Sequence, residues 1–352
     1  MNITIAGIGN AGTTIGADLS RKGHKVTLLK TSDKLHNEHY EYLLREKKVC
    51  VKDLDGTYVA NIHRVTDNYE DAVKEADVII IFIQTNYHKE LINRISPYLR
   101  NGQCIIIEPG YLATCFFMQC TDKDLTIIEA ESSPIDCRIV EPGSVNVYFK
   151  NVLNPFGVFP SSKKREAKSV LDQLGYPYVF TNNVVEAALH NPNLIVHTIG
   201  AIFSIPRIEY SHGEYWMYKE VFTPHIWNVV ESLDNEKMNV LEKLGCERIP
   251  YVEACKMRNS NNPDEDAMEV FRDYAQNGSP MGPTVPDSRY ITEDVPQGLV
   301  MLESLGSVLG VETPTTTGLI NCASAALNRD FRKEGRTVEV LKSENIKKIV
   351  NN

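Results

Sequence analysis

Gly7-Ile8-Gly9-Asn10-Ala11-Gly12 is the stretch that decides how the first half of this 352-residue chain folds. A short apolar strand is predicted before it over residues 2–6, and a helix over 13–22 and a second strand over 25–29 are predicted after it. A G-x-G-x-x-G motif in this order of strand, glycine turn, helix and strand is typical of dinucleotide-binding sites. The sequence therefore predicts a Rossmann-type α/β domain at the amino terminus.

Each glycine of this motif has its own physical role. Gly7 allows a tight turn, Gly9 lets the backbone approach a pyrophosphate, and Gly12 lets the helix pack closely against the strand. The helix that begins here offers free backbone N–H groups and a positive dipole to phosphates. We therefore expect Gly7, Gly9, Asn10, Ala11 and Gly12 to bind a cofactor; the alternative is a glycine turn without a ligand.

The end of the second predicted strand indicates which cofactor binds. An NAD site usually places an acidic residue about 20 residues past the glycines, where it binds the ribose 2′-hydroxyl. Here the chain has Lys30, Thr31 and Ser32, and one cation with two hydroxyls suits a 2′-phosphate better than a bare diol. We expect NADP(H) in preference to NAD(H). The alternative is that Lys30 is solvated and Asp33 reaches the ribose instead.

The rest of the first half continues the alternation of strands and helices. Residues 77–83 form an unbroken apolar run, as expected for a parallel strand that is buried on both faces. Gln84 follows this run, and ligands of open α/β sheets bind at the carboxyl ends of the strands, so Gln84 is a predicted cofactor contact. Further strands are predicted over 103–107, 125–129 and, at the far side of the sheet, 145–150, with helices over 70–76 and 91–99. Residues 1–182 are thus predicted to form one doubly wound NAD(P)-binding domain.

Helical periodicity replaces the strands in the second half, which predicts an all-α domain over residues 183–352. An Asn182-Asn183 cap should begin the first of its helices. The predicted helices cover residues 184–203, 219–245, 296–309 and 315–327. A helical domain that follows a nucleotide-binding domain is an arrangement found in dehydrogenases, although this inference is an analogy of fold alone.

The composition excludes several classes of protein. The chain has 37 Lys and Arg against 46 Asp and Glu, a net charge of −9, which argues against a broad nucleic-acid-binding surface. No apolar run reaches the roughly 18 residues of a transmembrane helix, and the amino terminus lacks the basic stretch of a secretory signal. The eight cysteines show no metal-binding spacing. We expect reduced thiols, no metal and a cytoplasmic location.

Two polar groups of residues in the helical half are candidates for catalysis. His197 lies on an otherwise apolar predicted helix, where it is either a catalyst or a buried core histidine; imidazole suits acid/base work near neutral pH. Arg289 and Asp294 precede a helix that has Pro296 in its first turn. Taken alone, Asp294 is better explained as a helix cap than as a catalytic residue.

Together these segments resemble the octopine/nopaline (opine) dehydrogenase family. The resemblance rests on the G-x-G-x-A-G start, on the N-P-N-x-x-x-H segment that ends at His197, and on the R-Y-x-x-E-D-V-P-x-G-L segment that starts at Arg289. One departure is Thr198, because the family commonly has proline after this histidine. The resemblance implies an NAD(P)H-dependent enzyme that condenses an amino acid with a 2-oxo acid and reduces the imine.

The resemblance also implies roles for individual residues. His197 would be the acid/base catalyst, Asp294 would orient it, and Arg289 would bind a substrate carboxylate. Cys137 lies where the family has a cysteine near the substrate. The implied partners are the two small-molecule substrates, and a homodimer is one possible assembly. Two alternatives stay open: a 2-oxo or 2-hydroxy acid reductase similar to ketopantoate reductase, which tends to use a lysine instead of His197, and a non-catalytic NADP sensor.

Overall fold

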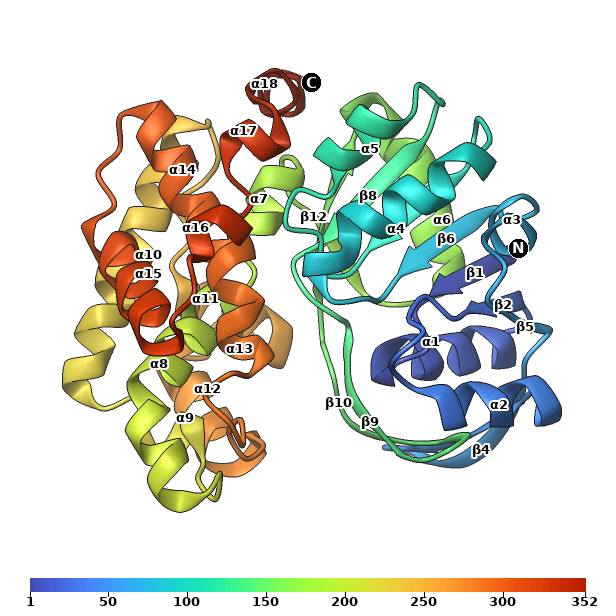
Figure 1. Ribbon diagram of the computed structural model, residues 1–352, viewed down its shortest axis with the longest axis horizontal. Helices are drawn as coiled ribbons and strands as arrows, with labels where there is room; N and C mark the ends of the chain where they lie inside the picture. Colours follow the sequence, from blue (N-terminus) through green and yellow to red (C-terminus); the bar gives the residue numbers. More distant parts are fainter. The chain divides into compact units, whose positions relative to one another are not determined.

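The computed structural model describes residues 1–352 and divides them into two compact units (Figure 1). The first unit comprises residues 1–187 together with Asn352, and the second comprises residues 188–351. The predicted boundary lay after residue 182. The first unit is a Rossmann-like α/β domain and the second is built of helices.

An eight-stranded sheet forms the centre of the first unit, in the order β12-β11-β8-β7-β6-β1-β2-β5. Every pair along this sheet is parallel except β11 with β8. The predicted strands at 2–6 and 25–29 are confirmed with the same limits. The strands are β1 (Asn2–Ala6), β2 (Lys25–Leu29), β5 (Arg64–Thr66), β6 (Val78–Ile81), β7 (Cys104–Ile107), β8 (Thr126–Ala130), β11 (Asn154–Phe159) and β12 (Tyr178–Phe180).

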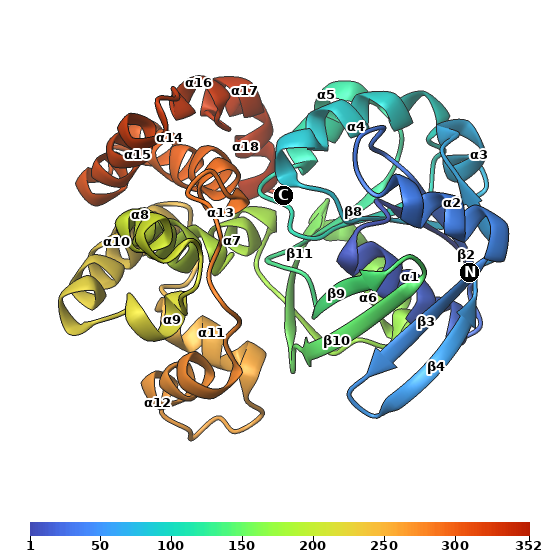
Figure 2. The ribbon, with the colours of Figure 1, turned by 60° about the horizontal axis from the view of Figure 1, so that its bottom comes forward.

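Helices cover both faces of this sheet, which buries its central strands. Figure 2 shows α3, α4 and α5 on one face and α1 and α6 on the other. β6 and β7 are buried along their whole length, which explains their unbroken apolar sequences. The helical segments are α1 (Asn10–Arg21), α3 (Tyr69–Val73), η1 (Thr85–Tyr87), α4 (His88–Ile95), η2 (Ser96–Tyr98), α5 (Thr114–Cys120), η3 (Ser161–Lys163) and α6 (Lys164–Leu174).

A second sheet of four strands packs against α1, in the order β4-β3-β10-β9. Its strands are β3 (Lys48–Asp53), β4 (Gly56–Asn61), β9 (Ile135–Glu141) and β10 (Ser144–Lys150), and α2 (Asn37–Glu46) precedes it. The predicted strand at 145–150 exists, but its expected place in the main sheet was wrong. Periodicity identifies a strand without identifying its partner, and β10 pairs with β9 and β3.

The long helix predicted over 184–203 is interrupted. The chain forms α7 (Val184–Leu189) and α8 (Asn193–Ser211), because Pro192 has no N–H and disfavours a helical conformation at the residue before it. The predicted cap is confirmed, since Asn183 Oδ1 accepts hydrogen bonds from the backbone of Val185 and Glu186.

The remaining helices of the second unit include the three other predicted ones, with shifted ends, and several that were not predicted. Pro224 begins a new helix inside the segment predicted over 219–245, and a π-turn opens the one predicted from 296. They are α9 (Met217–Glu220), α10 (Pro224–Lys243), α11 (Tyr251–Asn259), α12 (Ala267–Asp273), η4 (Tyr274–Gly278), α13 (Arg289–Thr292), η5 (Val295–Leu299), α14 (Val300–Leu309), α15 (Pro314–Leu327), α16 (Phe331–Glu334), α17 (Val338–Leu341) and α18 (Ser343–Val350).

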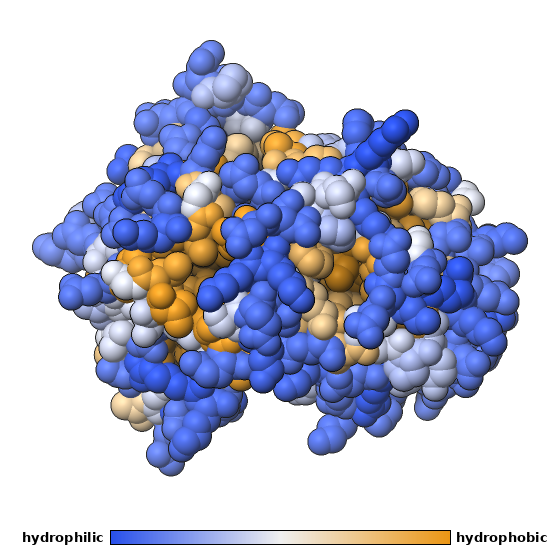
Figure 3. Space-filling view, turned by 90° about the horizontal axis from the view of Figure 1, so that it is seen from above, coloured by the Kyte–Doolittle hydropathy of each residue, from blue (hydrophilic) through white to orange (hydrophobic).

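The surface is mostly hydrophilic on the face drawn in Figure 3, with apolar patches between the charged side chains. None of the helices combines the length and the apolar character that a membrane span needs. All eight cysteines are free thiols, and five of them are buried: Cys104, Cys115, Cys137, Cys246 and Cys255. No group of three or more His, Cys, Asp or Glu side chains is arranged to hold a metal ion.

Candidate active site

The glycine loop between β1 and α1 has two tightly packed glycines and one open one. Gly7 has a φ of +106°, and a β-carbon there would lie 2.3 Å from the carbonyl oxygen of Phe82. A β-carbon on Gly12 would lie 1.9 Å from the carbonyl oxygen of Gly7. On Gly9 it would meet only His36 Nε2, at 3.5 Å. Gly9 is therefore the position where a ligand can approach the backbone closely.

The amino terminus of α1 is suited to an anion. No side chain caps it, and its first turn has no acidic residue, so its N–H groups are not neutralised by the chain's own carboxylates. Asn10 turns its side chain away from this role, because its Oδ1 accepts a hydrogen bond of 2.9 Å from the backbone of Ile139. Ala11 packs against the core. Both can contribute to the site only through the backbone.

His39 holds the glycine loop in place. The backbone N–H of Gly143 donates to Nδ1 of His39, so the other nitrogen, Nε2, carries the proton and donates to Thr13 Oγ1 at 3.0 Å. Thr13 in turn donates to the carbonyl of Ile8 within the loop. Burial lowers the pKa of His39 to about 4, which keeps the ring neutral. This buried link between α2, the loop and the β9–β10 turn carried no signal in the sequence.

The loop after β2 presents cationic and hydroxyl groups. Lys30 Nζ lies 5.2 Å from the ring centre of Tyr40. Ser32 Oγ accepts hydrogen bonds from the backbone of Lys34 and Leu35, which leaves its O–H able to donate to a ligand. His36 was missed by the sequence analysis; its ring lies near Gly9, and partial burial and the charge of Lys30 lower its pKa.

Two other predicted cofactor positions lie on the same unit. Thr31 follows Lys30 and is half-buried, and its carbonyl accepts a hydrogen bond from the Tyr69 hydroxyl. Gln84 lies beyond the end of β6 (Val78–Ile81), the strand that pairs with β1, and directly precedes η1. Its neighbours Phe82 and Ile83 pack on Gly7. The carboxyl end of β6 therefore lies beside the glycine loop, as parallel pairing requires.

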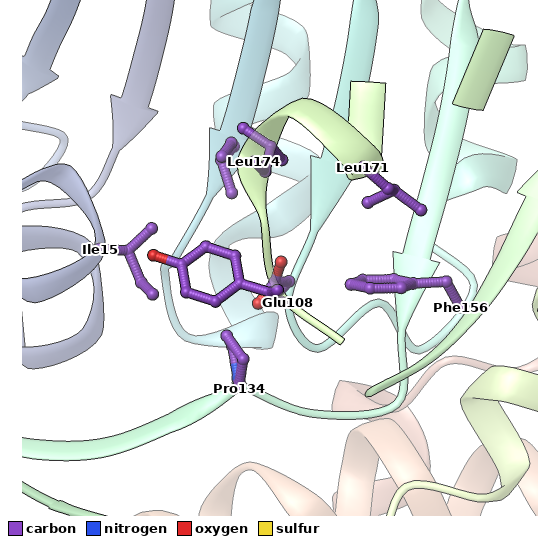
Figure 4. Close-up of a pocket in the computed structure, with 8 residues that line it drawn as sticks. Ile15, Glu108, Pro134, Phe156, Leu171 and Leu174 are labelled. Carbon is purple, nitrogen blue, oxygen red and sulfur yellow. The ribbon is translucent and has the colours of Figure 1, made fainter. Parts of the chain in front are cut away.

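Glu108 directly follows β7 and points into a small cavity inside the first unit (Figure 4). The cavity has a volume of about 10 Å³, which is about the room that one water molecule needs. Apolar side chains such as Ile15, Phe156 and Leu171 line it, and Oε2 of Glu108 has no hydrogen-bond partner. Burial raises the pKa of Glu108 to about 8, so the carboxyl group is protonated at neutral pH.

Replacement of Glu108 by glutamine is therefore expected to stabilise the protein at high pH. The unfolded chain ionises this carboxyl near 4.5, whereas the folded chain resists ionisation up to a pKa of about 8. The stability that the protonated acid contributes is full below 4.5 and is lost as the pH rises to about 8. The variant should gain a few kcal/mol over this range, because one pKa unit corresponds to about 1.4 kcal/mol.

Urea unfolding of both proteins at about pH 5 and about pH 9 measures this difference. The exposed Glu166 on α6 gives the matched control, Glu166→Gln, whose stability should follow that of the wild type at both pH values. If Glu108→Gln were more stable than the wild type by the same amount at both pH values, ionisation of Glu108 would not be the cause.

In the second unit, His197 and Asp294 form a hydrogen-bonded pair although they are 97 residues apart in the sequence. His197 Nδ1 lies 2.8 Å from Asp294 Oδ2, and their side chains are 12% and 3% exposed. A carboxylate can only accept, so Nδ1 carries the proton and Nε2, on the opposite side of the ring, is left for substrate. Asp294 makes no capping bond, so the capping alternative is wrong for this residue.

Arg289 lies one helical turn before Asp294, at the start of α13. Its Nε is 3.2 Å from Oε2 of the buried Glu293, and its own side chain is 55% exposed. The guanidinium is thus anchored at one edge by an acid and reaches solvent. A group that is anchored in this way and still open to solvent suits the carboxylate-binding role that the sequence predicts.

The comparison with protein families identifies the helical half. A family model described as the alpha-helical domain of NAD/NADP octopine/nopaline dehydrogenase matches residues 180–327, which include His197, Arg289 and Asp294. The chain is also 28% identical over 345 residues to the opine dehydrogenase of Arthrobacter sp. (strain 1C), over 96% of this chain and 94% of that protein. The chain is therefore similar to opine dehydrogenases over nearly its whole length.

Further relatives match along nearly the whole chain. The octopine dehydrogenase of Pecten maximus is 24% identical over 95% of this chain and 92% of its own length. The solved structure of an octopine dehydrogenase in complex with NADH and agmatine has a TM-score of 0.81 at 17% identity, over 100% of this chain and 98% of that chain. A ketopantoate reductase model matches residues 3–108, which belong to the nucleotide-binding half. The resemblance recognised in the sequence is confirmed, as is the fold class.

One cysteine and one further histidine, Cys137 and His190, are buried and do not share the role of the His197–Asp294 pair. Cys137 on β9 is 2% exposed in the core of the first unit, and burial raises the pKa of its thiol to about 11. This position favours a packing role over the predicted substrate contact. His190 is also buried, with no partner for either ring nitrogen, and burial lowers its pKa to about 3. His190 is thus a neutral core residue, in contrast to His197.

Proposed function

We propose that the protein is an NAD(P)H-dependent opine dehydrogenase, which condenses an amino acid with a 2-oxo acid and reduces the resulting imine to a secondary amine. The His197–Asp294 pair carries the proposal, because it is an oriented acid/base group within the helical domain of this family. Related octopine dehydrogenase structures are described with NADH and L-arginine and with NADH and pyruvate. These names support an amino acid and a 2-oxo acid as the substrate classes.

The proton chemistry follows from the geometry of the pair. Condensation joins the amine nitrogen to the carbonyl carbon and releases the carbonyl oxygen as water with the two protons of the amine. A reduced nicotinamide cofactor, when bound, would supply the hydride for the resulting imine carbon. Nε2 of the neutral His197 ring accepts a proton from the amine and returns it to the departing oxygen; after Nε2 takes up one further proton from solvent, it gives that proton to the nitrogen as the imine is reduced. Asp294 holds the ring through Nδ1 and stabilises its charged form, as the carboxylate of a catalytic triad does.

We propose that Arg289 binds a substrate carboxylate. Both substrates and the product carry carboxylates, and a guanidinium can donate two parallel hydrogen bonds to such a group. The ion pair with Glu293 fixes one edge of Arg289 and offsets part of its charge. This partial neutralisation favours release of the product, which a bare buried cation would retain.

We propose NADP(H) as the preferred cofactor. Lys30 and Ser32 follow β2, His36 lies beside Gly9, and the acid expected of an NAD site is absent from the end of β2. The exposed Asp33 is the only acidic side chain between residues 30 and 36. Among related structures, a yersinopine dehydrogenase is described with bound NADP⁺.

Replacement of Lys30 by glutamine should therefore lower kcat/KM for NADPH by about 10–100-fold and leave kcat/KM for NADH nearly unchanged. This loss is what one charged hydrogen bond to a phosphate contributes. Lys34→Gln is the matched control, because Lys34 is an exposed lysine of the same loop. A wild-type preference for NADH, or equal losses with both cofactors in Lys30→Gln, would contradict the proposal.

Turnover with panels of substrates tests the proposed reaction. NADPH oxidation is followed with 2-oxo acids alone, with amino acids alone and with both. We expect oxidation only when both are present. Oxidation with the oxo acid alone would favour a reductase similar to ketopantoate reductase, and cofactor binding without turnover on any pair would favour an NADP sensor.

We further propose a cytoplasmic location and a homodimeric assembly. Eight free thiols support a reducing compartment. The assembly is tested by light scattering of the purified protein, for which we expect twice the chain mass of 39.6 kDa.

A further inference from the structure

We propose that Tyr290 is a positioning residue for catalysis, which fixes the plane of the His197 ring so that Nε2 points at the reacting atoms. This inference rests on the proposed function. The two rings are stacked with their centroids 3.6 Å apart and their planes within 7° of each other. In this close, parallel contact the phenol ring of Tyr290 lies over one face of the imidazole.

The hydrogen bond that Nδ1 of His197 donates to Asp294 cannot by itself fix this ring. A single bond at Nδ1 sets the position of one atom, but the ring can still tilt about the axis that joins Nδ1 to Oδ2. Tilting changes the direction in which the N–H or lone pair of Nε2 points. A second contact on the face of the ring removes this freedom, and the Tyr290 phenol is that contact.

Tyr290 is itself held firmly enough to act in this way. It lies on α13 and packs against a cluster of buried side chains that contains Ile208, Tyr215 and Met217. Tyr290 and Asp294 are four residues apart, one helical turn, so the same short segment contacts both the face and the Nδ1 edge of His197. The π-turn η5 begins directly after Asp294, and such turns often occur at functional sites.

The role of a positioning residue predicts a particular kinetic pattern. A proton donor that is misplaced by about 1 Å can lose up to about 10²-fold in rate. Tyr290→Leu should therefore lower kcat by about 10–100-fold while the KM values of the amino acid and oxo acid and the Kd of NADPH change little. Tyr290→Phe keeps the stacked ring and removes only the hydroxyl, so it should retain kcat within a few-fold of the wild type.

A double-mutant comparison separates positioning from a merely structural role. In a His197→Ala background there is no ring to position, so adding Tyr290→Leu should cause no further loss of kcat. A loss of similar size in both backgrounds would overturn the proposal, and so would a large loss in Tyr290→Phe, which would assign the function to the hydroxyl. If Tyr290→Leu fails to fold by circular dichroism, Tyr290→Met provides similar bulk without a ring and is tested in its place.

The experiment distinguishes this inference from the proposed reaction. The variants are assayed with whichever substrates the wild type turns over, so a wild type that reduces the oxo acid alone refutes the opine reaction and leaves the Tyr290 test intact. A wild type that condenses both substrates, combined with unchanged kcat in Tyr290→Leu, refutes the role of Tyr290 alone.

Discussion

His197→Ala is expected to lower kcat by about 10²–10⁴-fold, the usual contribution of a positioned acid/base group, while NADPH binding stays near that of the wild type. The imidazole is the group that Asp294 orients, and alanine leaves the substrate nitrogen without a proton donor. Asp294→Asn should also lower kcat strongly, because an amide cannot stabilise the imidazolium. Single-turnover kinetics with saturating NADPH separate this effect from cofactor binding.

The controls for this prediction come from other histidines of the helical unit. His225→Ala should leave kcat unchanged, because His225 is exposed at the start of α10. His190→Ala is expected to lower the stability, because it empties a buried site, without a specific loss of kcat. Wild-type turnover in both His197→Ala and Asp294→Asn would show that the hydrogen bond between these residues is only structural.

Gly9→Val should abolish detectable NADPH binding and leave the fold intact. A β-carbon at Gly9 meets only a flexible side chain, His36, at 3.5 Å, and no positive φ is required there. The valine side chain would instead occupy the space through which a pyrophosphate approaches the backbone. Fluorescence titration with NADPH measures the loss, and circular dichroism measures the fold.

Two other glycines provide the comparison. Gly12→Ala should destabilise the first unit itself, because its β-carbon would lie 1.9 Å from the carbonyl oxygen of Gly7. Gly318→Ala should affect neither binding nor folding adversely, because Gly318 lies in α15 with open space around it. Unchanged NADPH affinity in Gly9→Val would be fatal to the proposed cofactor site.

Local signals in the sequence were sufficient for the central part of the nucleotide-binding half. β1 and β2 follow the predicted limits because strands that are buried on both faces appear as short apolar runs between glycines and charged residues. Pairing between distant strands has no such local signal. The four-stranded sheet joins residues 48–61 to residues 135–150, and no local pattern separates β10 from the strands of the main sheet.

In the helical half, too, local features could be read from the sequence and contacts between distant residues could not. The break at Pro192 follows from local chemistry and was overlooked because the apolar pattern continues on both sides of it. The pairing of His197 with Asp294 could not be deduced from spacing, since each residue had a plausible structural role when taken alone. The family resemblance supplied that pairing. Tyr290 lay inside a recognised motif, but its stacking on His197 depends on the three-dimensional packing of α13 beside α8.

One labelling experiment tests the proposed reaction most directly. The enzyme is given NADPH that carries deuterium at the transferred position of the nicotinamide, together with an amino acid and a 2-oxo acid, and the product is analysed by mass spectrometry. We expect a secondary amine that contains both carbon skeletons and one deuterium on the former carbonyl carbon, and we expect none from His197→Ala in the same time. Deuterium found only in a 2-hydroxy acid, with the amino acid unchanged, would contradict the account.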